Sequence, residues 1–481
     1  MYIGVDLGST NVKAALYDGD LNCIAQKSAP VTYIRQGEFI EFDGQGYCSL
    51  LLTLLHQLME ENPVAVKQIA FTGQAESLVC LDEQGLPVCN VISWMDERSS
   101  EECALLETIF SQEECHRVTG QQAILPTWPA TKILWLRRNR PEIFSKVATY
   151  MLLKDYIIYR LTGIKTADMS IATFSFYFDI YRKCYWQKML DAIGITQEQL
   201  PPLVEPCTVV GTLTEEAAAA AGLNREVRVN TGTLDHFAGM IGTGNTAPGG
   251  MTLSTGTTMV LATMGEGIPD PDCDMALHYG FVPNTYVMLP VMESGGVCLD
   301  WFRRTCLGNM DYDTLNRELL QCADSQLLFL PYLVGTNAPE FDREATGVFF
   351  GLRQEHTATQ MAKAVMEGVC FVLRKNCEDI LRKGTKISSI VATGGGAKSP
   401  VWCQLQADIT GLPVVVPQVT EAACLGAAII AAGSEEGNGT LEAAGHVNIV
   451  RSYTPRPTEV LEEKYRKFCR LYEAALEIAR I

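Results

Sequence analysis

One local design occurs twice in this chain and constrains its fold more than any other feature. Residues 2–7 form an apolar run that passes through Gly8–Thr10 into a second apolar run at 12–17. Residues 251–262 repeat the order strand, Gly/Ser/Thr turn, strand. This pattern is typical of a β-hairpin, and either copy alone can be an ordinary turn. Backbone N–H groups and hydroxyls at such a turn can face a phosphate. Because both halves of the chain open with this hairpin, the sequence predicts a duplicated α/β unit.

Strands and helices alternate in the rest of each half. Leucines at helical spacing predict a helix over 44–61, and a further helix is expected over 96–110. Apolar runs predict strands at 69–73 and at 387–393, the second ending in three consecutive glycines. The order of elements therefore favours α/β architecture in both halves.

Glycine marks the expected domain boundary. Seven glycines lie within residues 228–260, with threonines between them, whereas the flanking segments have few. The second hairpin begins inside this stretch. The sequence therefore predicts two domains, at 1–245 and 246–481.

Composition excludes several classes of function. The net charge is −18 and no Lys/Arg-rich run is present, so a nucleic-acid partner is not expected. The seventeen cysteines contain no CxxC pair, which predicts reduced thiols rather than disulfides or a metal cluster. No basic and apolar leader precedes the first strand, and no apolar stretch approaches the ~20 residues needed to span a bilayer. We therefore expect a cytoplasmic protein with no membrane partner.

Several motifs resemble those of one family, in the same order along the chain. Residues 6–13 are similar to the first phosphate motif of the FGGY family of carbohydrate kinases. Thr127–Asn139 resembles the first family signature, although Thr127 is atypical at its opening position. Gly347–Leu352 and Gln360–Glu367 fit the second signature. The chain thus resembles the FGGY family over nearly its whole length, and within it the kinases that act on xylulose.

The resemblance implies both a fold and a reaction. The fold would be α/β, with two ribonuclease H-like domains of the actin and sugar-kinase ATPase type around an ATP cleft. The reaction would be ATP- and Mg²⁺-dependent phosphorylation of a primary hydroxyl of a small sugar, most closely a ketopentose. Kinases of a tetritol, a pentitol, gluconate or glycerol are alternatives, as are a non-catalytic sugar-responsive regulator and an actin-like ATPase. The expected partners are the sugar or polyol and ATP, and analogy with dimeric relatives adds a homodimer.

Phosphoryl transfer needs positioning, charge neutralisation by Mg²⁺ and a carboxylate that accepts the hydroxyl proton. Asp235 ends a predicted strand and begins a Gly-rich helix. An N-cap role would explain Asp235 equally well from the residues alone, and the resemblance assigns it the catalytic role. Asp6, at the end of the first strand, is expected to hold Mg²⁺, with Asp235 as the second carboxylate at the metal.

The resemblance also implies a set of nucleotide-contacting residues at the turns. Lys13 is expected near the β- and γ-phosphates, and a solvated strand residue is the alternative. The run of three glycines lacks the GxGxxG order, so a dinucleotide site is not expected there. The resemblance implies that Gly396 and Ala397 contact the adenosine–phosphate part of ATP. The full predicted set is Gly8, Ser9, Thr10, Lys13, Gly256, Thr257, Thr258, Gly296, Gly395, Gly396 and Ala397.

Polar residues that follow the strand at 69–73 predict the sugar site. Gln74 and Glu76 can hydrogen-bond to hydroxyls, as recognition of a buried polyol requires. The xylulose kinases of the family typically carry Met-His where this chain has Ala75-Glu76. This departure leaves the identity of the sugar open, together with the hydroxyl that is phosphorylated, the oligomeric state and the regulation.

Three further residues complete the predicted sugar site, each with a structural alternative. Asp96 either binds hydroxyls or forms only an ion pair with Arg98. Trp128 either stacks on the apolar face of the sugar or belongs to the core. His236 either contacts the substrate or is a hydrogen-bonded residue at the start of a helix.

Overall fold

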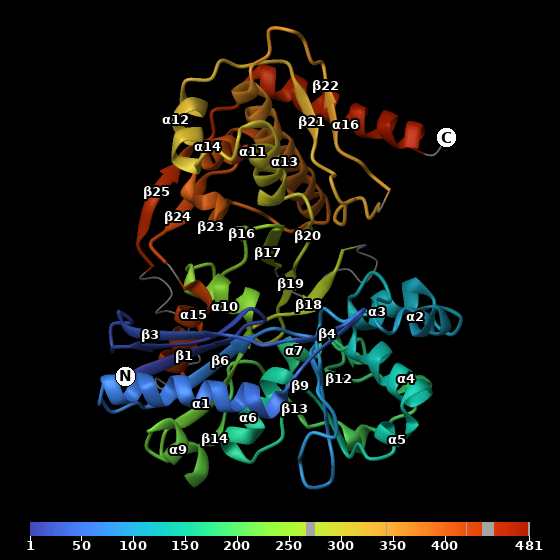
Figure 1. Ribbon diagram of the computed structural model, residues 1–481, viewed down its shortest axis with the longest axis vertical. Coiled ribbons are helices and arrows are strands. Elements are labelled where there is room, and N and C mark those ends of the chain that lie inside the picture. The colour runs from blue at the N-terminus through green and yellow to red at the C-terminus, as the bar shows by residue number, and fades with distance from the viewer. Residues whose placement is uncertain (266–274, 343, 420, 435–446, 480–481) are drawn as a thin grey trace. The chain divides into compact units, whose positions relative to one another are not determined.

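The computed structural model describes residues 1–265, 275–342, 344–419, 421–434 and 447–479, which form two compact units (Figure 1). Unit 1 comprises the described residues of Met1–Thr246, Gly267–Val287 and Val419–His446. Unit 2 comprises those of Ala247–Glu266, Met288–Gln418 and Val447–Ile481. Unit 1 thus takes up two short segments from the second half of the chain.

The strands of unit 1 are β1 (Tyr2–Leu7), β2 (Asn11–Tyr17), β3 (Cys23–Pro30), β4 (Ile34–Gln36), β5 (Phe39–Phe42), β6 (Gln68–Gly73), β7 (Leu78–Leu81), β8 (Val91–Ile92), β9 (Thr149–Leu152), β10 (Ala167–Asp168), β11 (Phe178–Asp179), β12 (Cys184–Tyr185), β13 (Leu203–Val204), β14 (Val209–Thr212), β15 (Arg228–Leu234) and β18 (Leu277–Tyr279). Its helices are α1 (Gly44–Glu61), α2 (Ser100–Glu107), α3 (Gln112–Thr119), α4 (Pro129–Asn139), α5 (Pro141–Phe144), α6 (Leu153–Thr162), α7 (Met169–Ala172), α8 (Gln187–Ile193), the 3₁₀ helix η1 (Gln197–Gln199), α9 (Glu215–Ala221), α10 (Asp235–Gly242) and α15 (Ala422–Gly433). The chain leaves unit 1 within β19 (Tyr286–Met288).

The main sheet of unit 1 has the strand order β14-β15-β6-β1-β2-β3. The predicted first hairpin is confirmed: β1 and β2 pair antiparallel around the turn at Gly8–Thr10, with Asp6 opposite Lys13. Strands β1, β6 and β15 are parallel, so their carboxyl ends share one edge of the sheet. Leu7, Gly73 and Leu234 lie side by side at that edge.

Helices cover both faces of this sheet. Helix α1 begins after Asp43, whose side chain accepts a hydrogen bond from the backbone N–H of Gln45, and it has the bounds that leucine spacing predicts. Its buried leucines share one core cluster with Ile3 and Val5 of β1. Figure 1 shows α1 along one face of the strands and α15 beside α10 on the other.

Small residues allow α15 to approach its neighbours closely. A Cβ on Gly4 of β1 would overlap the backbone of Cys424, and a Cβ on Gly426 would overlap the backbone of Ala238 in α10. A Cβ on Gly242 of α10 would likewise overlap Ala422. Helix α15 therefore packs backbone to backbone against β1 and α10, and this packing brings the residue before it, Glu421, to the edge of the sheet that carries Asp6.

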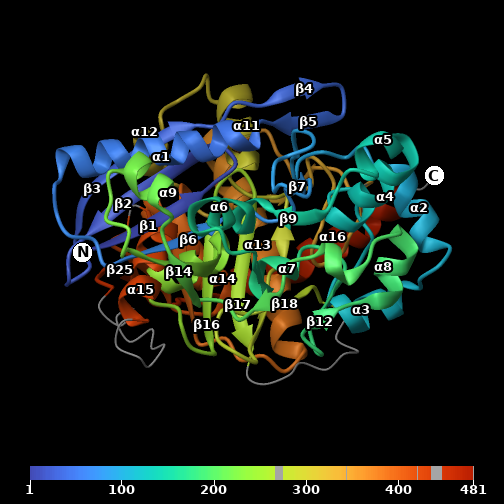
Figure 2. The ribbon, with the colours of Figure 1, turned by 90° about the horizontal axis from the view of Figure 1, so that it is seen from below.

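Helices α2, α4, α5 and α8 form a group at the side of unit 1, drawn in teal and green in Figure 2. The predicted helix over 96–110 is wrong at its start, because α2 begins at Ser100. The carboxylate of Asp96 accepts hydrogen bonds from the backbone N–H groups of Arg98 and Ile40, which holds residues 93–99 in a turn. Side-chain competition of this kind explains why Asp favours turns over helix interiors.

Unit 2 contains β16 (Gly250–Thr255), β17 (Met259–Gly265), β20 (Val291–Met292), α11 (Gly296–Cys306), α12 (Tyr312–Leu320), β21 (Leu328–Leu330), β22 (Val348–Phe350), α13 (Ala358–Arg382), β23 (Ser389–Gly394), the 3₁₀ helix η2 (Gly396–Lys398), α14 (Pro400–Thr410), β24 (Val414–Pro417), β25 (Ile449–Tyr453) and α16 (Glu459–Ala479).

The sheet of unit 2 repeats the design of unit 1. Hairpin β16–β17 is antiparallel, β16 and β23 are parallel, β23 and β24 are parallel, and β25 adds an antiparallel edge. Hairpin β1–β2, then β6 and β15, then the antiparallel edge β14 follow the same order in unit 1. The predicted duplication is therefore confirmed. Among the described residues, no helix combines the length and the apolar character needed to cross a membrane.

Candidate active site

The carboxyl edge of the main sheet in unit 1 brings predicted site residues from three strands together. Asp6 of β1 lies beside Thr72 of β6, and Thr72 lies beside Thr233 of β15. Asp235 follows β15 directly, and Gln74 follows β6. Ligands of α/β proteins bind at such a carboxyl edge, so the position agrees with the role that the sequence predicts for these residues.

A bulge in β15 sets the direction in which the chain reaches Asp235. The register between β15 and β6 shifts between Asn230 and Thr233. Gly232 has a φ of +61°, and a Cβ there would overlap the carbonyl oxygen of Phe71. Bulges often aim a side chain beside an active site. The sequence analysis did not single out Gly232, although an isolated glycine in a strand pattern is a signal for a bulge.

Asp235 is the first residue of α10, whereas Leu234 occupies the N-cap position and makes no side-chain cap. The Asp235 carboxylate accepts a hydrogen bond from the backbone N–H of the adjacent His236, at 2.6 Å, and both residues are partly exposed. Asp235 therefore does not have the conventional capping role that was the alternative. Its carboxylate keeps lone pairs available to a ligand.

The pKa of the Asp6 carboxyl is raised in the folded chain. Burial raises the pKa of Asp6 to about 7, and the negative charges of Asp235 and Glu421 add to the effect, while Lys13 opposes it. The Oδ1 atom of Asp6 is buried and has no hydrogen-bond partner among the described residues. An unpartnered carboxylate oxygen beside a second carboxylate is the donor set that Mg²⁺ prefers, so the residues fit this ion.

Lys13 pairs with Glu421, with 2.6 Å between Nζ and Oε2. Both side chains are about one-third exposed, at 30%. The ion pair excludes the alternative of a freely solvated strand lysine. The sequence analysis missed Glu421, which lies 408 positions from Lys13 and carries no local motif.

The turn of the first hairpin is held from two sides. The hydroxyl of Tyr47 donates to the carbonyl oxygen of Gly8, at 2.9 Å, and that of Tyr33 donates to the carbonyl oxygen of Ser9, at 2.8 Å. Thr10 is exposed. The carbonyl groups are thus engaged by the protein, which leaves the N–H groups and hydroxyls of the turn as its ligand-facing donors.

The second predicted nucleotide cluster lies entirely within unit 2. The backbone N–H of Gly296 donates to the carbonyl oxygen of Gly256, at 2.8 Å, and that of Val297 donates to Thr257, at 3.0 Å. Helix α11 therefore begins directly on the turn of hairpin β16–β17. A Cβ on Gly296 would overlap Gly256, so this approach requires glycine.

The glycines after β23 complete the same cluster. Gly394 lies beside Thr255 in the parallel pair β16–β23 and has a φ of +76°. A Cβ on Gly394 would lie 2.7 Å from the carbonyl oxygen of Thr255, and one on Gly396 would lie 2.7 Å from the Thr255 Cβ. Gly395 is exposed, and η2 begins at Gly396 with Ala397 buried. The predicted glycines at 256, 296, 395 and 396 thus gather around the second turn.

Gln74, in the predicted sugar site, is almost fully buried. Its Oε1 accepts a hydrogen bond from the hydroxyl of Ser77, at 2.7 Å, and that hydroxyl accepts one from the backbone N–H of Trp94, at 3.1 Å. The Nε2 atom of Gln74 has no partner at hydrogen-bond geometry among the described residues. The side chains of Tyr33 and Tyr47 also interact with Gln74, so this amide lies in a polar setting beside the turn that these tyrosines contact.

Asp96 is fully buried and engaged by protein donors. One carboxylate oxygen accepts from Nε of Arg98 and the other from the second guanidinium nitrogen, each at 2.7 Å. The second oxygen also accepts from the backbone N–H of Ile40, at 2.6 Å. The geometry favours the ion-pair alternative for Asp96, with Arg98 extending the pair to Glu41.

Trp128 is buried and lies in an aromatic cluster. Its ring stacks on Phe176, with 5.8 Å between centroids, and its Nε1 donates to the carbonyl oxygen of Ala123, at 3.0 Å. The structure thus favours the core alternative for Trp128. A sugar-stacking role for it stays a prediction.

Glu76 is partly exposed and has a φ of +65°, a conformation that is rare outside glycine. Burial of its carboxylate raises its pKa to about 7, while Lys132 and a hydrogen bond from Thr127 oppose the rise. Lys132 is fully buried, and its Nζ donates to the carbonyl oxygen of Ser93, at 2.8 Å. Lys132 lies within Thr127–Asn139, the stretch that resembles the first family signature, and the sequence predicts no separate role for it.

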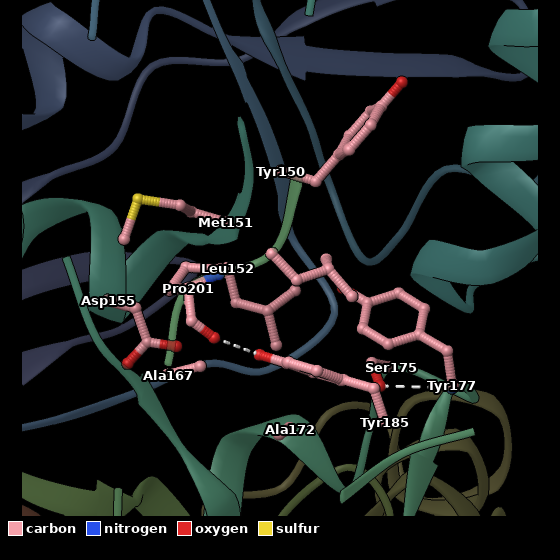
Figure 3. Close-up of a pocket in the computed structure, with 11 residues that line it drawn as sticks. Tyr150, Met151, Leu152, Asp155, Ala167, Ala172, Ser175, Tyr177, Tyr185 and Pro201 are labelled. Atoms are coloured by element: carbon pink, nitrogen blue, oxygen red, sulfur yellow. Dashed lines mark hydrogen bonds between the residues drawn. The ribbon is translucent and has the colours of Figure 1, made fainter. Parts of the chain in front are cut away.

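A separate cavity in unit 1 is lined mainly by tyrosines and apolar side chains (Figure 3). Burial raises the pKa of Asp155 in its wall to about 7. The adjacent Lys154 is fully buried and pairs with Asp168, at 2.8 Å, and donates to the carbonyl oxygen of Thr231. None of the predicted site residues lines this cavity. In the part of the chain that the structure describes, no cluster of three or more His, Cys, Asp or Glu is arranged to hold a metal.

Comparison with known families agrees with this geometry. The profile for the N-terminal domain of the FGGY family of carbohydrate kinases matches residues 1–242, and that for the C-terminal domain matches residues 251–434. The chain therefore belongs to the FGGY family of carbohydrate kinases. It is a phosphotransferase that uses ATP to phosphorylate a sugar, with the two-domain fold of that family.

Individual relatives place the chain near one branch of the family. It is 32% identical to the xylulose kinase of Escherichia coli strain K12 over 415 aligned residues, and the alignment covers 85% of each protein. Among solved structures, the xylulose kinase from Rhodospirillum rubrum superposes with a TM-score of 0.92 at 26% identity, covering 100% of this chain and 99% of that one. A gluconate kinase from Lactobacillus acidophilus superposes with a TM-score of 0.89 at 26% identity, covering 100% and 97%.

Proposed function

We propose that this chain transfers the γ-phosphoryl group of ATP to a primary hydroxyl of a ketopentose, with xylulose as the first candidate. The observation that carries the proposal is the pair of carboxylates, Asp6 at the end of β1 and Asp235 directly after β15, at the carboxyl edge of one sheet in which only β6 separates the two strands. Similarity to xylulose kinases supports the choice of sugar.

In the proposed reaction, Asp235 accepts the proton of the sugar hydroxyl as its oxygen bonds to the γ-phosphorus. The bond from that phosphorus to the β–γ bridging oxygen breaks, and ADP leaves. A general base of this kind accelerates a reaction by roughly 10²–10⁴. The free lone pairs of the Asp235 carboxylate support this role.

Asp6 and Asp235 are the residues that we propose hold Mg²⁺, which would neutralise charge on the phosphates. Ser9, Thr10 and Lys13 are assigned to the β- and γ-phosphates, and the glycine cluster of unit 2 to the nucleotide. Gln74 and Glu76 are assigned to the sugar, with His236 next to the base. A homodimer and a cytoplasmic location also stay proposals.

A coupled assay of ADP release with a panel of sugars tests the proposal. The panel holds pentuloses, hexuloses, pentitols, tetritols, gluconate and glycerol. We expect turnover to be fastest with a ketopentose. ATP consumption without any sugar would point to an ATPase, and sugar binding without turnover would point to a regulator.

Substitution Asp235→Asn tests the base. We expect kcat to fall by roughly 10²–10⁴ with little change in the KM for ATP, because the carboxylate acts on the hydroxyl proton in the transition state. Steady-state kinetics with the best sugar of the panel measure both constants. A variant within tenfold of the wild-type kcat would remove Asp235 from the role.

A further inference from the structure

The bulge of β15 lies just before the proposed base and is enclosed by buried polar side chains. The register with β6 passes from Asn230 directly to Thr233, so Thr231 and Gly232 bulge out of the pairing. Backbone groups that leave a sheet ladder inside a protein need other partners, because an unpaired buried carbonyl or N–H group is costly. Asp235 follows this bulge directly at the start of α10, so the shape of the bulge decides where its carboxylate lies.

Lys154, in the first turn of α6, holds the first residue of the bulge. Its Nζ donates to the carbonyl oxygen of Thr231, at 2.6 Å, and forms an ion pair with Asp168, at 2.8 Å. All three residues are fully buried. A hydrogen bond from a charged donor in such a place is stronger than one between neutral groups, so this contact fixes the Thr231 carbonyl firmly.

The carboxylate of Asp168 also holds the residue on the other side of the bulge. The hydroxyl of Ser170 donates to this carboxylate, and its Oγ lies 2.9 Å from one oxygen and 3.0 Å from the other. The hydroxyl of Thr233 donates in turn to Ser170 Oγ, at 2.9 Å. Ser170 and Thr233 are fully buried as well. The contacts therefore run from Thr233 back to Thr231 and close around Gly232.

The backbone of the bulge is bound at every polar group. The N–H of Gly232 donates to Oδ1 of Asn230, at 2.8 Å, and its carbonyl oxygen accepts from the N–H of Cys207, at 2.7 Å. The N–H of Thr231 donates to the carbonyl oxygen of Thr208, at 2.8 Å. The Thr231 carbonyl is the group in this set that is bound by a charged side chain.

We propose that the buried pair of Lys154 and Asp168, together with Ser170, positions the Asp235 carboxylate by fixing the bulge of β15. The inference rests on the proposed function, in which Asp235 is the base. The three are positioning residues, because they act on the reaction through the backbone that carries Asp235. Placement of this kind matters, since a displacement of about 1 Å can lower a rate by about 10²-fold.

Ser170→Ala is the first test, because it removes the contact with Thr233 and leaves the ion pair in place. We expect kcat to fall by about 3- to 30-fold while the KM for ATP stays within about twofold. Steady-state kinetics with the best sugar of the panel measure both constants. Control variant Ser175→Ala removes another fully buried hydroxyl of the same segment, one that accepts from the backbone N–H of Tyr177, and should leave kcat unchanged.

A double-mutant cycle with Asp235→Asn separates positioning from a general structural effect. If Ser170 acts through the Asp235 carboxylate, Ser170→Ala should change kcat by less than about twofold once that carboxylate is absent. ADP release at high enzyme concentration measures the residual rate. The same loss of kcat in Asp235→Asn as in the wild type would show that Ser170 acts by another route and would overturn the inference.

The ion pair is tested by Lys154→Met alone and together with Asp168→Asn. The single variant leaves a buried carboxylate unpaired, so it should lower the midpoint of urea unfolding and can prevent folding. The double variant removes both charges and keeps a side-chain oxygen for Ser170, so the midpoint should recover at least in part. Its kcat should stay about tenfold or more below that of the wild type, because the Thr231 carbonyl has lost its donor. Recovery of kcat together with the midpoint would overturn the inference.

Failure of this inference and failure of the proposed function have different signatures. If Asp235→Asn lowers kcat and Ser170→Ala does not, the inference is wrong and the kinase assignment stands. If the wild type turns over no sugar of the panel, the proposed function is wrong, and the inference that rests on it is wrong as well.

Discussion

Asp6→Asn should stabilise the protein and at the same time abolish its kinase activity. The carboxylate of Asp6 is buried beside Asp235 and Glu421, so its ionised form is penalised in the folded chain. Its pKa is about 7 when folded, against an ordinary value of 3.8. Asparagine has a similar shape without the charge, so it removes the penalty. It also removes the residue that we propose binds Mg²⁺.

The magnitude and its pH dependence follow from linkage. Between pH 3.8 and about 7 the folded chain binds more protons at Asp6 than the unfolded chain does, so ionisation costs stability increasingly as pH rises. At about 1.4 kcal/mol per pH unit, the ceiling above pH 7 is about 4 kcal/mol. Relaxation of the surrounding structure lowers the cost of a buried charge below this ceiling, so we expect about 1–3 kcal/mol at pH 8 and about a third of that at pH 5.

Thermal unfolding at pH 5 and pH 8, without added Mg²⁺, measures the effect. For a unit of this size, 1 kcal/mol corresponds to about 2–4 °C, so Tm should rise by several degrees at pH 8 and by less at pH 5. Control variant Asp20→Asn, on an exposed turn, should change Tm at neither pH. A loss of stability on Asp6→Asn, or a gain that is the same at both pH values, would refute the electrostatic reasoning.

Three further substitutions test other parts of the structure. Lys13→Met should raise the KM for ATP by about 10- to 100-fold with little change in the KM for the sugar, because it removes the charged group that we propose donates to the phosphates. Steady-state kinetics measure both constants, and Lys27→Met, which breaks a surface pair with Glu61, should change neither. Gly394→Ala should lower the free energy of unfolding in urea by about 1–3 kcal/mol, because Gly394 has a positive φ and lies close to the backbone of Thr255. The control Gly395→Ala should lower it by less than about 0.5 kcal/mol, because the nearest atom to a Cβ there is 3.8 Å away. Lys154→Met should lower the free energy of unfolding by about 3–5 kcal/mol in the same assay, because it leaves the buried carboxylate of Asp168 without its ion-pair partner. A smaller decrease would mean that water reaches this carboxylate.

The parts of the fold that local chemistry determines were predictable from the sequence. The first hairpin is set by a polar turn between two apolar runs, and helix α1 by leucine spacing and the Asp43 cap. The start of α2 was not predictable from periodicity, because Asp96 binds the backbone of Ile40, which is remote in sequence. Periodicity reports which face of an element is buried, and it does not report side chains that bond across the fold.

The same distinction separates the predicted from the unpredicted parts of the site. Asp6 and Asp235 each lie at the end of an apolar run, so the neighbouring residues in the sequence are enough to identify both positions. Glu421 reaches Lys13 only because glycines let α15 pack against β1 and α10, and no motif encodes that contact. The buried Lys132 of α4 likewise donates to the carbonyl oxygen of Ser93, which lies 39 positions away on another segment. Partners of a site residue that come from another element are fixed by packing, and one sequence does not disclose them.

The ionised form of Asp6 destabilises the free protein, yet it is the form that we propose binds Mg²⁺. In the free protein, burial and the charge of Asp235 raise the pKa of Asp6 to about 7, which is a cost to its ionised form. A bound divalent cation would favour that ionised form, because a metal ligand must be deprotonated, so metal binding near pH 7 should release protons. Asp235→Asn removes one of the negative charges that raise the pKa of Asp6, so we expect the variant to release fewer protons for each Mg²⁺ ion that it binds. Calorimetry in two buffers of different ionisation enthalpy measures this number, and an unchanged release would mean that Asp235 does not act on Asp6.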